Sequence, residues 1–118
     1  MGTLSMSNSD KEYDPHDAIN FIYTHKDQYA KAKGQLAQLE AFKSSLKAIQ
    51  MQLSSQTSIS GKEMDAYASE EYQALCNGIG AATEQVESLR WALESAKMRF
   101  QLFQTMSANN RQIEKFTI

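Results

Sequence analysis

The sequence has few of the residues that build catalytic, metal or disulfide sites. Its 118 residues include one cysteine, Cys76, and two histidines, His16 and His25. A single cysteine excludes a disulfide within the chain, and these three residues do not have the spacing of zinc ligands. We therefore predict a protein of a reducing, cytoplasmic location that is not an enzyme and holds no metal or other cofactor.

Long apolar runs and an excess of basic residues are also missing. No apolar run approaches the roughly 20 residues of a membrane span, and the polar first ten residues do not resemble a signal peptide. A soluble, unsecreted protein with no membrane partner is expected. The net charge of −2 does not mark a general nucleic-acid binder, although local basic patches can bind in an acidic protein.

Proline occurs once, at Pro15. The preceding Asp14 can cap the free N–H groups of a helix, and proline suits the first helical position. Asp17 then favours the positive end of the helix dipole. Beyond it, apolar residues recur in steps of three and four without a break until about Ser54, which predicts a helix over residues 15–53.

A second and longer apolar pattern begins at Tyr72. Its members alternate in steps of three and four residues and are Tyr72, Leu75, Ile79, Ala82, Val86, Leu89, Leu93, Ala96, Phe100 and Phe103. This heptad pattern is typical of a long helix that packs against another helix. Because about 32 residues span roughly 48 Å as a helix, we expect a partner of similar length. The helix is predicted near residues 70–107, with Asn109 and Asn110 marking its end.

The stretch between the two patterns, residues 54–61, is polar and rich in hydroxyl groups, which predicts a loop. Ser60 and Glu63 have the spacing of a capping box, so a short helix is expected from there to about Ala68. Ser69 would then cap the second long helix, whose first turn is acidic.

Two long helices joined by a short connection bury each other's apolar faces only if they lie antiparallel. Charge agrees with this pairing, because residues 26–62 sum to +4 and residues 63–94 to −6. The predicted fold class is all-α: a helical hairpin of two long antiparallel helices with a short connecting helix, assembled into a coiled-coil homo-oligomer. Residues 1–13 are expected to form a disordered N-terminal arm and residues 14–118 a single helical-hairpin domain.

Two groups of basic residues are candidate nucleic-acid contacts. The first helix contributes Lys33, Lys43 and Lys47, and the second contributes Arg90 and Lys97. Such rows can follow a phosphate backbone. The alternative, which the spacing alone favours, is a solvated face whose lysines pair with acids of the other helix.

Trp91 lies outside the heptad pattern, between Arg90 and Lys97. It could stack on nucleic-acid bases, or it could form a second apolar seam with Met98 and Leu102 that contacts another subunit. The subunit contact is favoured, because a small chain with long apolar faces needs an oligomer to cover them.

Several short runs resemble a known group of proteins. They are Ala30-Lys31-Ala32-Lys33, Leu39-Glu40-Ala41-Phe42-Lys43, Lys47-Ala48, Met51, Ala66-Tyr67-Ala68, Glu71-Tyr72, Ala81-Ala82-Thr83-Glu84 and Leu89-Arg90-Trp91. Over roughly residues 26–112 the chain is similar to small phage-encoded helical proteins found among recombination genes. More distantly it resembles the UvsY-type recombination mediators, which are helical oligomers that bind single-stranded DNA.

This resemblance implies a function and one site residue. Mediators of this type help to load a recombinase onto strands coated with single-strand-binding protein, and a Leu-Lys-Ala-Arg run contributes to their DNA binding. Leu46-Lys47-Ala48-Ile49 matches three of these positions, so the resemblance carries over Lys47, whereas Ile49 replaces the arginine. The expected partners are single-stranded DNA, a recombinase and a single-strand-binding protein, in the host cytoplasm.

Two functions therefore stay open. The first is a phage accessory protein of DNA recombination or replication that binds single-stranded DNA as an oligomer and assists recombinase loading. The second is a non-enzymatic helical protein–protein interaction module that engages a phage or host replication protein. Exposed lysines on one face would favour the first function. An exposed Trp91, with the lysines held in ion pairs, would favour the second.

Overall fold

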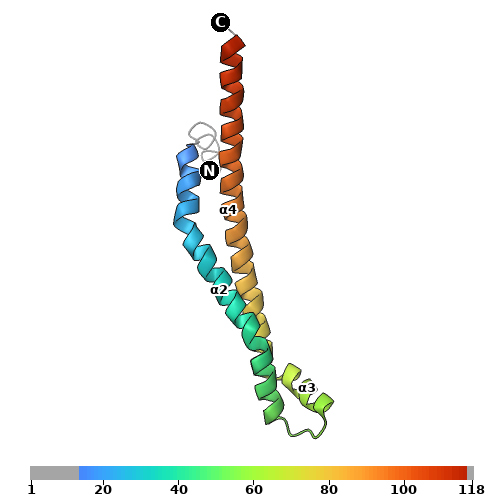
Figure 1. Cartoon of the computed structure of the whole chain (residues 1–118). Helices are drawn as coiled ribbons and strands as arrows, with labels where there is room; N and C mark the ends of the chain where they lie inside the picture. Colours follow the sequence, from blue (N-terminus) through green and yellow to red (C-terminus); the bar gives the residue numbers. More distant parts are fainter. Residues whose placement is uncertain (1–13, 117–118) are drawn as a thin grey trace, which may run out of the picture. The chain divides into compact units, whose positions relative to one another are not determined.

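The computed structural model of the chain describes residues 14–116. This part forms three helices, α2 (Pro15–Leu53), α3 (Ile59–Ala68) and α4 (Glu70–Phe116), and contains no strand (Figure 1). The all-α prediction of two long helices with a short helix between them is confirmed. The predicted disordered arm, residues 1–13, lies outside the described residues.

The start of α2 follows the predicted capping pattern. The Asp14 carboxylate accepts a hydrogen bond of 2.9 Å from the backbone N–H of His16, and Pro15 occupies the first helical position. Both ends of α2 fall where the sequence predicts them. Since Asp14 satisfies an N–H group that the helix itself cannot pair, it fixes where α2 begins.

The cap of α3 differs from the prediction. Ser58 is the N-cap, with extended backbone (φ −89°, ψ 153°), and its hydroxyl accepts a hydrogen bond of 3.0 Å from the Gly61 N–H. Ser60 already lies inside the helix, so the predicted capping box of Ser60 and Glu63 is wrong. A cap residue needs a non-helical backbone, which leaves Ser58 in that role. The loop is accordingly shorter than predicted and covers residues 54–58.

Ser69 caps α4 as predicted and also closes α3. Its hydroxyl accepts a hydrogen bond from the Tyr72 N–H at 3.2 Å and donates one to the Ala66 carbonyl at 2.7 Å. One side chain therefore pairs a free carbonyl at the end of α3 and a free N–H at the start of α4.

The far end of α4 extends beyond the predicted boundary near residue 107. The helix continues to Phe116, so Asn109 and Asn110 lie inside it and do not mark its end. Asparagine costs a helix well under 1 kcal/mol relative to alanine, and the residues that follow are mostly good helix formers. Lys115 in the last turn also favours the negative end of the dipole.

The chain divides into two compact units built from the same helices. One unit contains α2 up to Asp27 together with α4 from Arg90 onward, and the other spans Gln28–Leu89. In the second unit, the rest of α2 lies beside α3 and the beginning of α4, and the two long helices run in opposite directions (Figure 1). The prediction of a single domain over residues 14–118 stays a prediction.

The buried core of both units is small. Its apolar members are Ala18 and Ala96 in the first unit and Ala32, Leu46, Ala66, Tyr72 and Val86 in the second. Four of these seven are alanines, which let helices approach closely but bury little area each. No large side chain within residues 14–116 is fully buried. The single chain therefore has a thin core.

The two apolar patterns are buried to different extents. In α4 the predicted heptad positions are buried or half-buried from Tyr72 to Phe100. In α2 the pattern is covered less completely, because Phe42, Ile49 and Leu53 are exposed. Long apolar side chains thus remain at the surface even within the predicted packing stripe.

Candidate functional site

Lys47 connects α2 to α3. Its ammonium group lies 3.5 Å from a carboxylate oxygen of Glu63 and 4.8 Å from the centre of the Tyr67 ring. Tyr67 in turn packs edge-on against Tyr72 of α4, with 5.3 Å between ring centres. Hydrogen bonding with Tyr67 and then attraction to the Glu63 carboxylate raise the pKa of Lys47 above its ordinary value. The residue predicted to contact DNA therefore holds α3 against its neighbours.

The other two predicted lysines of α2 are exposed. The Lys33 ammonium lies 5.8 Å from the centre of the Tyr29 ring, which is near the outer limit of a cation–π contact. Lys43 is one turn before Lys47 and extends from the helix surface into solvent. Of the three lysines, only Lys33 and Lys43 are thus available to an external anion.

The basic residues predicted on α4 belong to the other compact unit. Arg90 is half-buried, and its guanidinium lies 4.7 Å from the centre of the neighbouring Trp91 ring. Lys97 is exposed. The five predicted basic residues are therefore distributed over both units, three on α2 and two on α4.

The predicted subunit contact lies on an exposed face of α4. Trp91, Met98 and Leu102 are 56, 52 and 60% exposed. Three further large apolar side chains on the same face are also more than half exposed, and we call the six residues the outer row: Trp91, Met98, Leu102, Met106, Ile113 and Phe116. At 3.6 residues per turn, this row lies about half a turn from the covered residues Leu93 and Ala96.

The last three members of the outer row were missed by the sequence prediction. A spacing of 11 residues, from Trp91 to Leu102 and from Leu102 to Ile113, indicates Ile113, and Met106 lies one turn after Leu102. Three turns of a straight helix take about 10.8 residues, so this spacing keeps side chains on one face, whereas a strict seven-residue spacing drifts around it. A search with the heptad alone therefore reaches Phe116, two heptads after Leu102, but does not include Met106 and Ile113, which lie beside the heptad positions.

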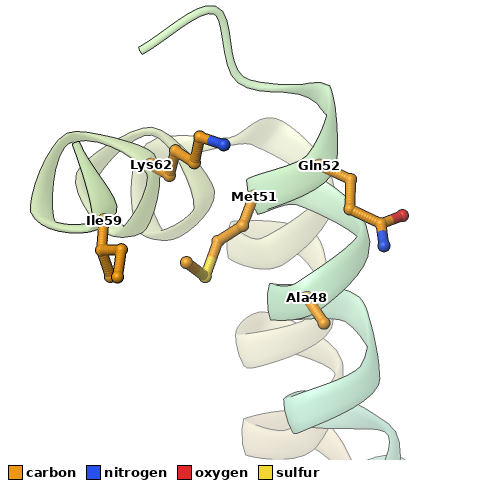
Figure 2. Close-up of a pocket in the computed structure, with 5 residues that line it drawn as sticks. All are labelled: Ala48, Met51, Gln52, Ile59 and Lys62. Atoms are coloured by element: carbon orange, nitrogen blue, oxygen red, sulfur yellow. The ribbon is translucent and has the colours of Figure 1, made fainter. Parts of the chain in front are cut away.

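A shallow hollow lies between the end of α2 and α3. It has a volume of about 330 Å³ and is lined by Ala48, Met51, Gln52, Ile59 and Lys62. Figure 2 shows the Met51 side chain extending from α2 toward α3, with Ile59 and Lys62 on the α3 side. Lys62 is the one titratable group in this lining, so the hollow offers no acid–base pair for catalysis.

The histidines and acids do not converge on a common point. Within residues 14–116 there is no group of three histidine, cysteine, aspartate or glutamate side chains that could hold a metal ion. The His25 ring stacks on Phe21 with 4.1 Å between centres, and its Nδ1 lies 2.8 Å from the Phe21 carbonyl oxygen. The His25 ring is therefore engaged by Phe21, one turn before it in α2.

Comparisons with protein-family models, curated proteins and solved structures give no match for this chain. In the part of the chain that the structure describes, no helix combines the length and the apolar character needed to cross a membrane.

Proposed function

We propose that this protein is a non-enzymatic helical interaction module that works as an assembly of several copies joined through the outer row of α4. The observation that carries this proposal is the row itself. Six large apolar side chains, each more than half exposed, follow one face of one helix. A row of large exposed apolar side chains of this kind on a small protein marks an interaction site.

Two further observations support the proposal. The core of the single chain is thin and rich in alanine, which is typical of chains that complete their core with a partner. In addition, Trp91 is exposed while Lys47 is engaged with Glu63 and Tyr67. The exposed Trp91 and the engaged Lys47 fit a protein-binding module, whereas the exposed Lys33 and Lys43 support the second candidate below.

Sedimentation of the purified protein tests this function. The wild type should sediment as an oligomer at micromolar concentration. Leu102→Glu places a charge in the middle of the outer row and should give a monomer with the same helix content by circular dichroism. Gln104→Glu adds the same charge at an exposed position on the other side of α4, so it should leave the oligomer intact. A wild type that is monomeric throughout this range would end the proposal.

Binding of single-stranded DNA is the second candidate function. Lys33 and Lys43 are exposed on α2, and repetition around an oligomer multiplies the few phosphates that one chain can neutralise. The resemblance to recombination mediators points the same way and adds recombinase loading as the purpose of such binding.

A titration with a single-stranded oligonucleotide at low salt tests the second candidate. The double variant Lys33→Ala/Lys43→Ala should weaken binding more than tenfold and flatten its salt dependence. It avoids Lys47, whose removal would also disturb α3. The matched control is Lys26→Ala, because the Lys26 ammonium already pairs with Asp27 at 3.0 Å. Equal binding by the wild type and the double variant would exclude the two lysines as DNA contacts.

A further inference from the structure

We infer that the occupant of the outer row is a second copy of the same α4, aligned parallel and in register as a two-stranded coiled coil. This inference rests on the proposed function and specifies its partner and geometry. Charged residues flank the outer row on both sides. Their charges select one orientation among those that an apolar row by itself would allow.

Heptad positions can be assigned along the exposed face from Trp91 onward. With Trp91 at position d, the d series is Trp91, Met98, Thr105 and Gln112, and the a series is Ser95, Leu102, Asn109 and Phe116. Met106 and Ile113 then fall at position e, beside the seam. The layers contain both large and polar residues, so an apolar seam alone does not specify the alignment.

The flanking charges are complementary in the parallel arrangement. Glu94 occupies position g and Arg99 the next position e, five residues later. In a parallel coiled coil the g residue of one helix lies beside the following e residue of its partner. Two symmetric Glu94–Arg99 pairs would therefore form across the seam. In an antiparallel pair g faces g and e faces e, so Glu94 would lie beside its own copy and would not meet Arg99.

Both charges are accessible for this role. Arg99 is exposed and Glu94 half-buried, and neither forms an ion pair with another residue of the stretch 14–116. The two side chains are also too far apart in helical phase to pair within one helix, because only residues three or four apart are neighbours there.

Asn109 supplies a second argument for register. It lies inside α4, at a central a position of the assigned heptads, where the layer of a parallel dimer would place it opposite its own copy. A single asparagine at an a position specifies parallel alignment and dimers at some cost in stability, because its amide must find the partner amide. A slip of one heptad would leave it against Leu102 or Phe116.

The area available is sufficient for a dimer. Each of the six outer-row side chains exposes about 100 Å², so two copies could bury about 1,200 Å². That value is at the lower limit of stable protein–protein interfaces, and the flanking residues add to it. A reversible dimer at micromolar concentration is consistent with this area.

Disulfide trapping tests the alignment. In a Cys76→Ala background, which removes the one native thiol, Ser95→Cys places a single thiol in the seam. Parallel alignment in register brings the two introduced thiols together, so mild oxidation should give a covalent dimer in high yield. Gln104→Cys in the same background is the matched control, because position 104 lies on the other side of the helix, and it should remain mostly uncrosslinked.

Charge reversal tests the same alignment without cysteines. Glu94→Lys and Arg99→Glu should each weaken dimerisation about tenfold, because each change turns two attractions into two repulsions. The double variant Glu94→Lys/Arg99→Glu should recover the wild-type dissociation constant. Circular dichroism at the same concentrations shows whether each variant keeps its helices.

The outcomes separate the inference from the proposed function. Oligomers that do not crosslink at position 95, or that respond to each charge reversal without rescue, would overturn the parallel register and leave the function as an assembly module. A wild-type monomer would overturn both. Efficient crosslinking at position 95 together with rescue by the double variant would support both.

Discussion

Ser69→Ala is the single substitution for which the structure gives the best-defined cost. It removes the hydrogen bond that the Ser69 hydroxyl accepts from the Tyr72 N–H and the one that it donates to the Ala66 carbonyl. Loss of an N-cap costs about 1 kcal/mol. The second bond adds only about 0.5 kcal/mol, because the Ser69 N–H also donates to the Ala66 carbonyl, at 3.2 Å. We expect the free energy of unfolding to fall by about 1.5 kcal/mol.

Urea unfolding followed by circular dichroism at a fixed protein concentration measures this loss. Ser69→Asp should recover about two-thirds of it, since aspartate can accept from Tyr72 but cannot donate to Ala66. Ser88→Ala is the matched control at an exposed position in the middle of α4, and it should change stability by less than about 0.5 kcal/mol. A Ser69→Ala variant as stable as the Ser88→Ala variant would refute the double capping role.

Three further predictions follow from local geometry. Ser58→Ala should speed hydrogen exchange of the α3 amides several-fold, because its hydroxyl caps the helix, whereas Ser60→Ala should not. Gly78→Ala and Gly80→Ala should each raise the free energy of unfolding by up to about 1 kcal/mol and the thermal unfolding temperature with it, since an added methyl group meets no atom of a neighbouring segment within 4 Å at either site. Destabilisation by either change would show that another chain packs there. The raised pKa of Lys47 means that its contacts stabilise α3 fully below the ordinary lysine pKa of about 10.4 and are lost as the pH rises through the raised value. The stability difference between the wild type and Lys47→Met should therefore disappear in strong alkali, and a difference that persists there would mean that packing of the lysine stem dominates.

The sequence predicted the helices more accurately than their surroundings. Asp14 and Ser69 cap helices through contacts with residues two or three positions away, so their roles follow from local sequence. Ser58 and Ser60 are both capable of capping, and the choice between them depends on where the chain turns back after α2. The end of α4 was predicted too early because two asparagines are a weak signal against a helix.

The candidate contacts show the same difference between what local sequence predicts and what contacts between distant segments decide. The exposure of Trp91, Met98 and Leu102 agrees with a position outside the heptad stripe, although their role as a subunit contact stays a prediction. Lys43 and Lys47 lie one turn apart on α2, yet Lys43 is exposed whereas Lys47 is held by Glu63 and Tyr67 of α3. These partners lie 16 and 20 positions away in the sequence, and no helical periodicity relates them to Lys47.

The sequence by itself determined the two long helices, their polar connection and the apolar faces that they carry, because capping, helix propensity and periodicity act between residues a few positions apart. Only the tertiary structure decided which faces are covered. The pairing of α2 with α4 leaves the outer row of α4 exposed and places α3 over Lys47. Coverage depends on contacts between segments distant in the chain, and such contacts are set by packing rather than by local sequence.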